Sequence, residues 1–504
     1  MPRKFISLSA APLFYLLTAC ADTAVKPQTS AETPAEALPA ISLDFPFVTH
    51  HRGVFNGRTV DYTASVEALN VNDAEGRPGA RIVSISYVVE PDGQPDSRPV
   101  MFVFNGGPIS PSVYLHMGAF GPKRVEFSDD LSADPKTAPL VDNPYSILDA
   151  TDLVYFDPAG TGFSRVLPGK SPEDYFSVEA DAQQTAAFIA SWLESNGRSG
   201  SPTYLFGESY GTNRAAETAR QLAELPEPVF LDGVVLFGQA VNIIEYAQRP
   251  HNIISYVVSL PTLAALAWYH GKAGDQEARL QDFVDASWAY AQTDYLDALF
   301  QGNTLPADQL QLVADQLEYF TGLRSEFFVE NQLRVSKETY RSELFRDEGL
   351  VIGRSDGRYL ARVVEGEATP DPSGGLPAAL QEAFPGYLSG ELGVTSTEGY
   401  LFDSPVKSLD GWGWGGQSPF ARFDYGAGLT VLLEKHPETR VLVTAGYYDT
   451  MTTTGASIYY VEQETWPGAP AELKFYVGGH MAYSDENSAR EMAQDLRAMI
   501  SSSK

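Results

Sequence analysis

The first chemically suggestive feature of the sequence is a serine inside a G-x-S-x-G motif. Residues 207–211 read Gly-Glu-Ser-Tyr-Gly, with an apolar run at residues 204–206 before the motif and a helical pattern at residues 213–225 after it. A sharp strand-to-helix turn of this kind exposes the serine hydroxyl, and the flanking glycines admit the crowded backbone. The motif therefore predicts Ser209 as a nucleophile.

A serine hydroxyl is a poor nucleophile by itself, so it needs a base and a carboxylate that orients the base. Of the seven histidines, only His480 lies in a glycine-rich turn just after a late apolar run, at residues 473–477. Asp449 follows another apolar run, at residues 440–444. The order serine, acid, histidine is that of an α/β-hydrolase sheet. We expect Ser209, His480 and Asp449 to form a catalytic triad for acyl transfer.

Acyl transfer also requires hydrogen-bond donors for the oxyanion that develops on the attacked carbonyl group. The backbone N–H of Tyr210, directly after the nucleophile, can be one donor. Residues 105–107 (Asn-Gly-Gly) close an apolar run at residues 100–104 and can supply a second donor through the N–H of Gly107. A plain turn is the alternative, since Asn-Gly and Gly-Gly both form turns. We favour the oxyanion hole, because this loop opens at the same edge of the sheet as Ser209.

The elements that must position these residues are buried strands and amphipathic helices that alternate along the chain. Short continuous apolar runs predict strands buried on both faces, and apolar residues at helical spacing predict helices. Strands are expected at residues 82–89, 100–104, 153–156, 204–206, 229–237, 440–444 and 473–477. Helices are expected at residues 178–193, 213–225 and 487–500. This alternation predicts an α/β sheet.

The pattern changes between residues 238 and 404. Helical, aromatic-rich segments dominate there, at residues 263–270, 280–300 and 308–319. We expect a mainly helical cap inserted into the α/β core, because apolar strand runs resume after it; a separate domain is the alternative. The core then comprises residues 41–237 and 405–504.

The N-terminus is typical of a targeting segment rather than of a folded domain. Arg3 and Lys4 precede an apolar run at residues 5–17, and the sequence Leu-Thr-Ala-Cys then ends at Cys20. This ending resembles the lipobox of bacterial lipoproteins, whose cysteine receives lipid; an ordinary secretory peptide is the alternative. Residues 1–20 are thus expected to be a lipoprotein signal peptide, and residues 21–40 a flexible tether.

The cellular location follows from this expectation. Alanine after Cys20 resembles the pattern that directs bacterial lipoproteins to the outer membrane. We expect a lipid-anchored protein of the bacterial cell envelope, facing either the periplasm or the outside. No later segment reaches the roughly 18 uninterrupted apolar residues that a spanning helix needs, so the lipid is the only membrane contact expected.

The composition excludes several function classes. The 504 residues include 65 acidic and 35 basic side chains, a formal net charge of −30, so a nucleic acid would be repelled. The single cysteine excludes an intramolecular disulfide framework and a cysteine-based zinc site. No metal-ligand spacing occurs in the sequence, so neither a metal nor an organic cofactor is expected.

Five sequence blocks, in this order, resemble the serine carboxypeptidase family, peptidase family S10. They are NGGP at residues 105–108, DPAGTGFS at 157–164, GESY at 207–210, GYYD at 446–449 and GHM at 479–481. The resemblance extends from about residue 80 to residue 500 and is greatest to the bacterial branch without disulfides. It implies an α/β-hydrolase fold and removal of C-terminal residues from peptides at acidic pH.

The resemblance also implies roles for individual residues. It assigns Ser209, Asp449 and His480 to the triad and the N–H groups of Gly107 and Tyr210 to the oxyanion hole. It further implies that Asn105 and Glu208 bind the terminal carboxylate of the substrate.

A glutamate that meets a carboxylate is repelled unless the two share a proton. If Glu208 binds the substrate in this way, binding should strengthen as the pH falls, and the activity optimum should lie below neutral. The alternative is an ordinary surface glutamate in the variable position of the motif.

Two departures from the family pattern bear on specificity. Residues 109–112 read Ile-Ser-Pro-Ser where the family has Gly-Cys-Ser-Ser, which agrees with the absence of disulfides. Ala119 stands where the family has a second glutamate in a Glu-Leu-Gly-Pro block. One carboxylate-binding group is therefore missing.

The sequence is compatible with three functions. The first is a serine carboxypeptidase acting on peptides. The second is an esterase or acyltransferase that uses the same triad, because the fold does not select the acyl acceptor. The third is a non-catalytic, surface-binding lipoprotein on a hydrolase scaffold. The sequence makes no prediction of the oligomeric state.

Overall fold

The computed structural model describes residue 41 and residues 43–501, except for residues 74–75, 91–97, 275–278, 367, 416–423 and 469–470. The described residues belong to one compact unit that begins at Ala40. The predicted signal peptide and tether, including Cys20, lie outside the described residues.

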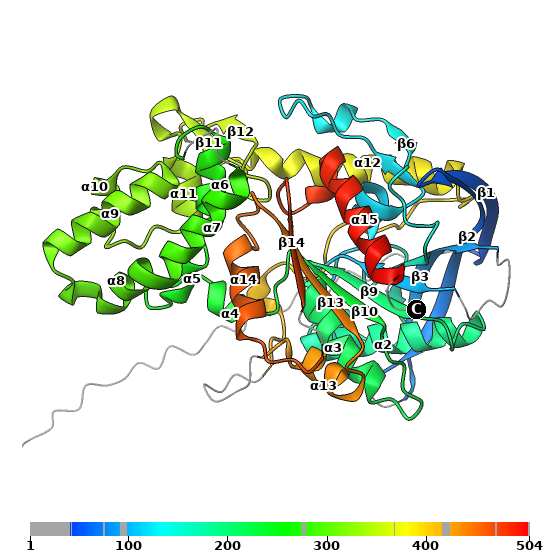
Figure 1. Ribbon diagram of the computed structural model, residues 1–504. Helices are drawn as coiled ribbons and strands as arrows, with labels where there is room; N and C mark the ends of the chain where they lie inside the picture. The colour runs from blue at the N-terminus through cyan, green and yellow to red at the C-terminus, as the bar shows by residue number, and fades with distance from the viewer. Residues whose placement is uncertain are drawn as a thin grey trace, which may run out of the picture. The chain divides into compact units, whose positions relative to one another are not determined.

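A ten-stranded mixed sheet forms the centre of this unit (Figure 1). Its strands are β1 (Phe47–Phe55), β2 (Arg58–Asn72), β3 (Pro78–Val89), β4 (Val100–Phe104), β7 (Asp152–Asp157), β8 (Arg165–Val166), β9 (Thr203–Glu208), β10 (Gly233–Phe237), β13 (Arg440–Gly446) and β14 (Glu472–Tyr476). The strand order is β1-β2-β3-β7-β4-β9-β10-β13-β14, and β8 pairs with β3 outside this path. From β1 to β7 neighbouring strands are antiparallel, and from β7 to β14 they are parallel.

The parallel strands are buried on both faces, which explains their continuous apolar sequences. All five residues of β4 are buried, and they alternate between two hydrophobic clusters. Met101 and Val103 join the cluster that contains α12 (Gly375–Gly390) and α15 (Glu486–Ser501). Phe102 and Phe104 join the cluster that contains α2 (Val178–Ser195), α3 (Gly211–Ala223) and α13 (Ala427–Lys435). Figure 1 shows these two groups of helices on opposite faces of the sheet.

The segment between β10 and β13 is mostly helical. It contains α4 (Ile243–Tyr246), α5 (Ile254–Val257), α6 (Leu260–Tyr269), α7 (Leu280–Tyr290), α8 (Leu296–Gln301), α9 (Ala307–Thr321), α10 (Ser325–Glu330), α11 (Lys337–Glu343) and α12. A short hairpin of β11 (Leu350–Ile352) and β12 (Leu360–Arg362) interrupts the helices. Helices α4–α11 share a third cluster, whereas α12 packs on the sheet. The end of this segment therefore covers the core rather than extending the helical group.

The remaining elements are short or connect the larger ones. Besides short 3₁₀ and π-helical turns, they are α1 (Val113–Leu115), β5 (Lys123–Val125), β6 (Leu140–Asp142) and α14 (Thr454–Gln463). Within the described part of the chain, no helix is long and apolar enough to cross a membrane. A parallel sheet with helices on both faces, preceded by antiparallel strands and carrying a serine turn after β9, is the α/β-hydrolase fold.

Candidate active site

Ser209 lies on a strained turn between β9 and α3. Its φ angle is 58°, in the left-handed region that is unfavourable for a residue with a Cβ atom. Its N–H donates to the carbonyl oxygen of Phe237 at 2.9 Å, which ties the turn to the neighbouring strand β10. The Ser209 carbonyl oxygen accepts from the N–H and the hydroxyl of Thr212, at 2.9 and 2.7 Å. These bonds hold the turn at the carboxyl edge of the sheet.

Two glycines allow the backbone to pack tightly around this turn. A Cβ atom on Gly207 would overlap the carbonyl group of Gly211, so the motif accepts no side chain there. A Cβ atom on Gly106 would lie 2.5 Å from the backbone nitrogen of Tyr210. The loop that carries Gly107 therefore touches the turn that carries the Tyr210 N–H, as an oxyanion hole built from these two donors requires.

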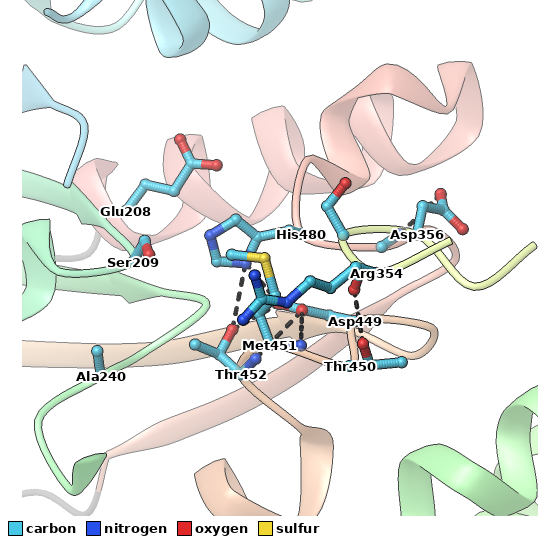
Figure 2. A network of polar contacts seen from close by, with 12 residues as sticks. Glu208, Ser209, Ala240, Arg354, Asp356, Asp449, Thr450, Met451, Thr452 and His480 are labelled. Carbon is cyan, nitrogen blue, oxygen red and sulfur yellow. Dashed lines mark hydrogen bonds and ion pairs between the residues drawn. The ribbon is translucent and has the colours of Figure 1, made fainter. Parts of the chain in front are cut away.

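The structure brings Asp449 and His480 into direct contact. Asp449 follows β13, His480 follows β14, and Asp449 Oδ2 lies 2.6 Å from His480 Nδ1. The carboxylate is fully buried and is fixed by three more donors, the N–H groups of Met451 and Thr452 and the hydroxyl of Thr452. Figure 2 shows the imidazole on the side of Ser209, with Asp449 on its other side.

The environment of His480 favours its charged form. Burial lowers the pKa of His480, but the charge and hydrogen bond of Asp449 outweigh burial and raise the pKa to about 9. The same contact with Asp449 would stabilise the imidazolium that forms if His480 takes the proton of a serine hydroxyl during attack.

Glu208 precedes the serine and is only 3% exposed. Its carboxyl group accepts hydrogen bonds from Asn105 Nδ2 and from the hydroxyl of Tyr483. Burial raises the pKa of Glu208 to about 7, although the positive charge of His480 and both hydrogen bonds lower it. A carboxyl group of this kind can hold its proton in a mildly acidic solution. Glu208 is therefore not the exposed surface glutamate that the sequence analysis gave as the alternative.

A cavity of about 230 Å³ joins these groups. Ser209, His480, Glu208, Asn105 and Gly107 all contribute to its wall. The rest of the wall includes Gly106, Ser110, Tyr114, Pro377, Met451 and Met481. The nucleophile, the base and the buried carboxyl group can therefore contact one bound molecule.

Segment 353–358, from the mainly helical region, connects the two loops that carry Asp449 and His480. The Ser355 carbonyl oxygen accepts from the His480 N–H at 2.5 Å, and Asp356 Oδ2 accepts from the Gly479 N–H at 3.0 Å. On the acid loop, the Thr450 hydroxyl donates to the Arg354 carbonyl oxygen at 2.7 Å (Figure 2). The segment thus fixes the spacing between base and acid.

Asp356 is itself held in place. It is 2% exposed and forms an ion pair with Arg358 at 2.7 Å. Neither residue was a sequence-based candidate, because the contacts of Asp356 with the histidine loop cross more than a hundred positions of the chain. In the sequence they are only an aspartate and an arginine two positions apart, a pairing that is not specific to a functional site.

Neither Tyr210 nor Ala119 contributes its side chain to the cavity wall. The side chain of Tyr210 is buried against Trp412, at a ring-centroid distance of 5.1 Å, so only its backbone is available to the site. Ala119 is buried beside α12 in the sheet cluster and is not part of the cavity wall. Among the described residues, no three His, Cys, Asp or Glu side chains gather as metal ligands would.

Comparison with known proteins finds similarity to serine carboxypeptidases. Residues 86–236 match the family model described as serine carboxypeptidase. Serine carboxypeptidase-like 40 of Arabidopsis thaliana is 29% identical over 176 residues, which are 34% of this chain and 32% of that protein. Serine carboxypeptidase 1 of Hordeum vulgare is 32% identical over 132 residues, 25% of this chain and 24% of that protein. The chain thus matches about a third or less of the length of these relatives.

A solved structure of a prohormone-processing carboxypeptidase from Saccharomyces cerevisiae aligns with 87% of this chain and 91% of its own, at 13% identity and a TM-score of 0.49. The segment that the family model matches, residues 86–236, holds Asn105–Gly107 and the Gly-Glu-Ser-Tyr turn, two of the four loops that line the cavity. Over residues 86–236 the chain is therefore similar to the serine carboxypeptidase family.

Proposed function

We propose that the protein is a serine carboxypeptidase that removes C-terminal amino acids from peptides. The observation that carries the proposal is a buried carboxyl group that lines the same cavity as the proposed nucleophile and base. Glu208, Ser209 and His480 all line this cavity, and Glu208 has a pKa near 7. An esterase needs only the serine, the base and oxyanion donors, whereas a carboxypeptidase also needs a group that recognises a terminal carboxylate.

In the proposed reaction, Ser209 Oγ attacks the last peptide carbonyl and His480 takes the hydroxyl proton. Asp449 orients the imidazole and stabilises the imidazolium, and the N–H groups of Gly107 and Tyr210 bind the oxyanion. The C–N bond breaks as His480 returns the proton to the departing amino acid. Water, activated by His480, then hydrolyses the ester on Ser209 and restores the free hydroxyl group.

Recognition of the substrate terminus falls to Asn105 and Glu208 in this proposal. A protonated Glu208 can donate a hydrogen bond to the substrate carboxylate, whereas an ionised Glu208 would repel it. Because the pKa of Glu208 is about 7, binding of peptide acids should strengthen as the pH falls through neutrality. This agrees with the optimum below neutral that the sequence predicts.

The test compares an N-blocked dipeptide with a free carboxyl group, the same dipeptide as an amide, and a nitrophenyl ester, at pH 4–8. Ser209→Ala is the matched control. We expect serine-dependent release of the last amino acid from the acid, strongest in acid, and little cleavage of the amide. Ester cleavage without amino-acid release would assign the triad to an esterase or acyltransferase, and Ala119 would explain the loss of peptide recognition.

Lipid attachment at Cys20 is a separate part of the proposal and rests on the sequence alone. The experiment is fractionation of cells that express the wild type or Cys20→Ser, followed by activity measurements in membrane and soluble fractions. Activity that leaves the membrane fraction only in Cys20→Ser would support a lipid anchor in the cell envelope. An unchanged distribution would contradict it.

A further inference from the structure

A tyrosine outside the predicted site holds the carboxyl group of Glu208. The Tyr483 hydroxyl lies 3.2 Å from both carboxyl oxygens of Glu208, to which it donates. Tyr483 is fully buried. The second donor, Asn105 Nδ2, is itself fixed, because Asn105 Oδ1 accepts from the Leu115 N–H at 3.1 Å. The orientation of the Glu208 carboxyl group therefore depends on two immobilised donors.

The ring of Tyr483 reaches Glu208 through space that small residues leave open. A Cβ atom on Gly118 would lie 2.6 Å from Tyr483 Cε2, so the ring fits only against a glycine. The next residue is Ala119, which stands where the family has its second glutamate and ends at a methyl group. Tyr483 therefore packs against Gly118 and brings its hydroxyl to Glu208.

Tyr483 also belongs to the loop that carries the base. It follows His480 by three residues, and the N–H of Ser484 donates to the Met481 carbonyl oxygen at 2.8 Å to close the turn. One short loop therefore positions the imidazole beside Ser209 and a hydroxyl group on Glu208.

We propose that Tyr483 is a positioning residue that aims Glu208 at the terminal carboxylate of the substrate. The inference rests on the proposed function, since it assumes that Glu208 binds that carboxylate. In this arrangement the neutral hydroxyl of Tyr483 fixes the orientation of the Glu208 carboxyl group. Glu208 alone supplies the proton that is shared with the substrate carboxylate.

If Tyr483 positions Glu208, it should also affect the pH dependence of substrate binding. The titratable groups that face Glu208 are His480 and Asp449 from the catalytic loops, Tyr114 from α1, and Tyr483 itself. The hydrogen bond from Tyr483 lowers the pKa of Glu208 against the effect of burial. Removing the hydroxyl should therefore raise the pKa of Glu208, in addition to loosening the carboxyl group.

The experiment measures KM and kcat of Tyr483→Phe from pH 5 to pH 8 with a blocked dipeptide acid and a nitrophenyl ester. For the acid we expect KM at pH 5 to rise severalfold, up to about tenfold, the order expected for a lost hydrogen bond between neutral groups. We also expect the pH at which KM begins to increase to move upward. For the ester, kcat and KM should stay within about twofold of the wild type, because the ester has no carboxylate for Glu208 to bind.

Tyr476→Phe is the matched control. Tyr476 is another buried tyrosine whose hydroxyl donates to a carboxylate, that of Asp495 at 2.9 Å, and it does not line the cavity. If Tyr483→Phe fails to fold, Gly118→Ala offers a second variant, since it displaces the ring without removing the hydroxyl. The same rise of KM for the acid alone is expected from it.

Equal losses on the acid and the ester, or an unchanged pH dependence of KM, would overturn the role of Tyr483. A wild-type enzyme that cleaves acids and amides equally well would overturn the proposed function, and with it this inference. The two failures are distinguishable, because the second is visible in the wild type before any variant is made.

Discussion

Replacing Glu208 by glutamine tests the buried carboxyl group most sharply. In the folded protein the pKa of Glu208 is about 7, against an ordinary value of 4.5. One pKa unit corresponds to about 1.4 kcal/mol, so an ionised Glu208 destabilises the folded state by about 3 kcal/mol. Between pH 4.5 and 7 the folded protein keeps a proton on Glu208 that the unfolded chain has already lost. The free energy of unfolding is therefore about 3 kcal/mol higher below pH 4.5 than above pH 7, and it falls as the pH rises through this range. Glu208→Gln cannot ionise and should lack this loss.

The assay is urea unfolding of the wild type and Glu208→Gln at pH 5 and pH 8. We expect the variant to gain about 2.5 kcal/mol relative to the wild type on going from pH 5 to pH 8, because part of the loss in the wild type has already occurred at pH 5. In the activity assay, KM for a dipeptide acid should increase above pH 7 in the wild type. It should be nearly independent of pH in the variant, because the glutamine amide donates to a carboxylate at every pH.

Glu464→Gln is the matched control. Burial also raises the pKa of Glu464 to about 7, but Glu464 is not part of the cavity wall. Its replacement should change the pH dependence of unfolding in the same direction and leave KM unaltered. A free energy of unfolding that differs equally between wild type and Glu208→Gln at both pH values would refute the reasoning, since Glu208 would then titrate normally.

Three further predictions concern the machinery around the serine. Asp449→Asn should lower kcat about 10⁴-fold with little change in KM, because the imidazole loses its orienting carboxylate; steady-state kinetics on a nitrophenyl ester would measure this, and a loss under tenfold would contradict it. Asp356→Asn weakens the acceptor for the Gly479 N–H, so kcat should fall at least about tenfold on ester and peptide alike; a change confined to KM would argue against a positioning role. Gly106→Ala places a methyl group 2.5 Å from the Tyr210 nitrogen, so kcat should fall about 10²-fold while circular dichroism stays native; unchanged kcat would place the oxyanion hole elsewhere.

The central strands could be predicted because burial on both faces leaves a continuous apolar run. Residues 100–104 were expected to form a strand, and β4 is Val100–Phe104. The helix expected at residues 213–225 begins earlier in the structure, at Gly211, because the tight serine turn leads directly into it. The strands β1 and β2 were missed. In β1 partly buried positions alternate with exposed ones, and histidines and an arginine interrupt the apolar pattern.

The triad residues could be nominated because their order along the chain and their places after strands are local signals. The residues that hold the proposed catalytic residues in place could not be predicted from the sequence. Tyr483 bonds to a residue 275 positions away, and segment 353–358 meets loops about a hundred positions further along. No periodicity marks such partners, since only the folded sheet brings the ends of β9, β13 and β14 together. The helices expected at 263–270 and 308–319 coincide with α6 and α9, but how α12 packs against the sheet was not visible in the sequence.

The most direct test of the central claim follows one peptide over time. A decapeptide with a free C-terminus and its C-terminally amidated twin are incubated at pH 5 with the wild type and with Ser209→Ala, and the products are identified by mass spectrometry. Stepwise loss of residues from the C-terminus of the free peptide by the wild type alone, with the amidated twin left intact, is the predicted result. Internal cleavage, trimming from the N-terminus, or equal attack on both peptides would contradict a carboxypeptidase that recognises the terminal carboxylate.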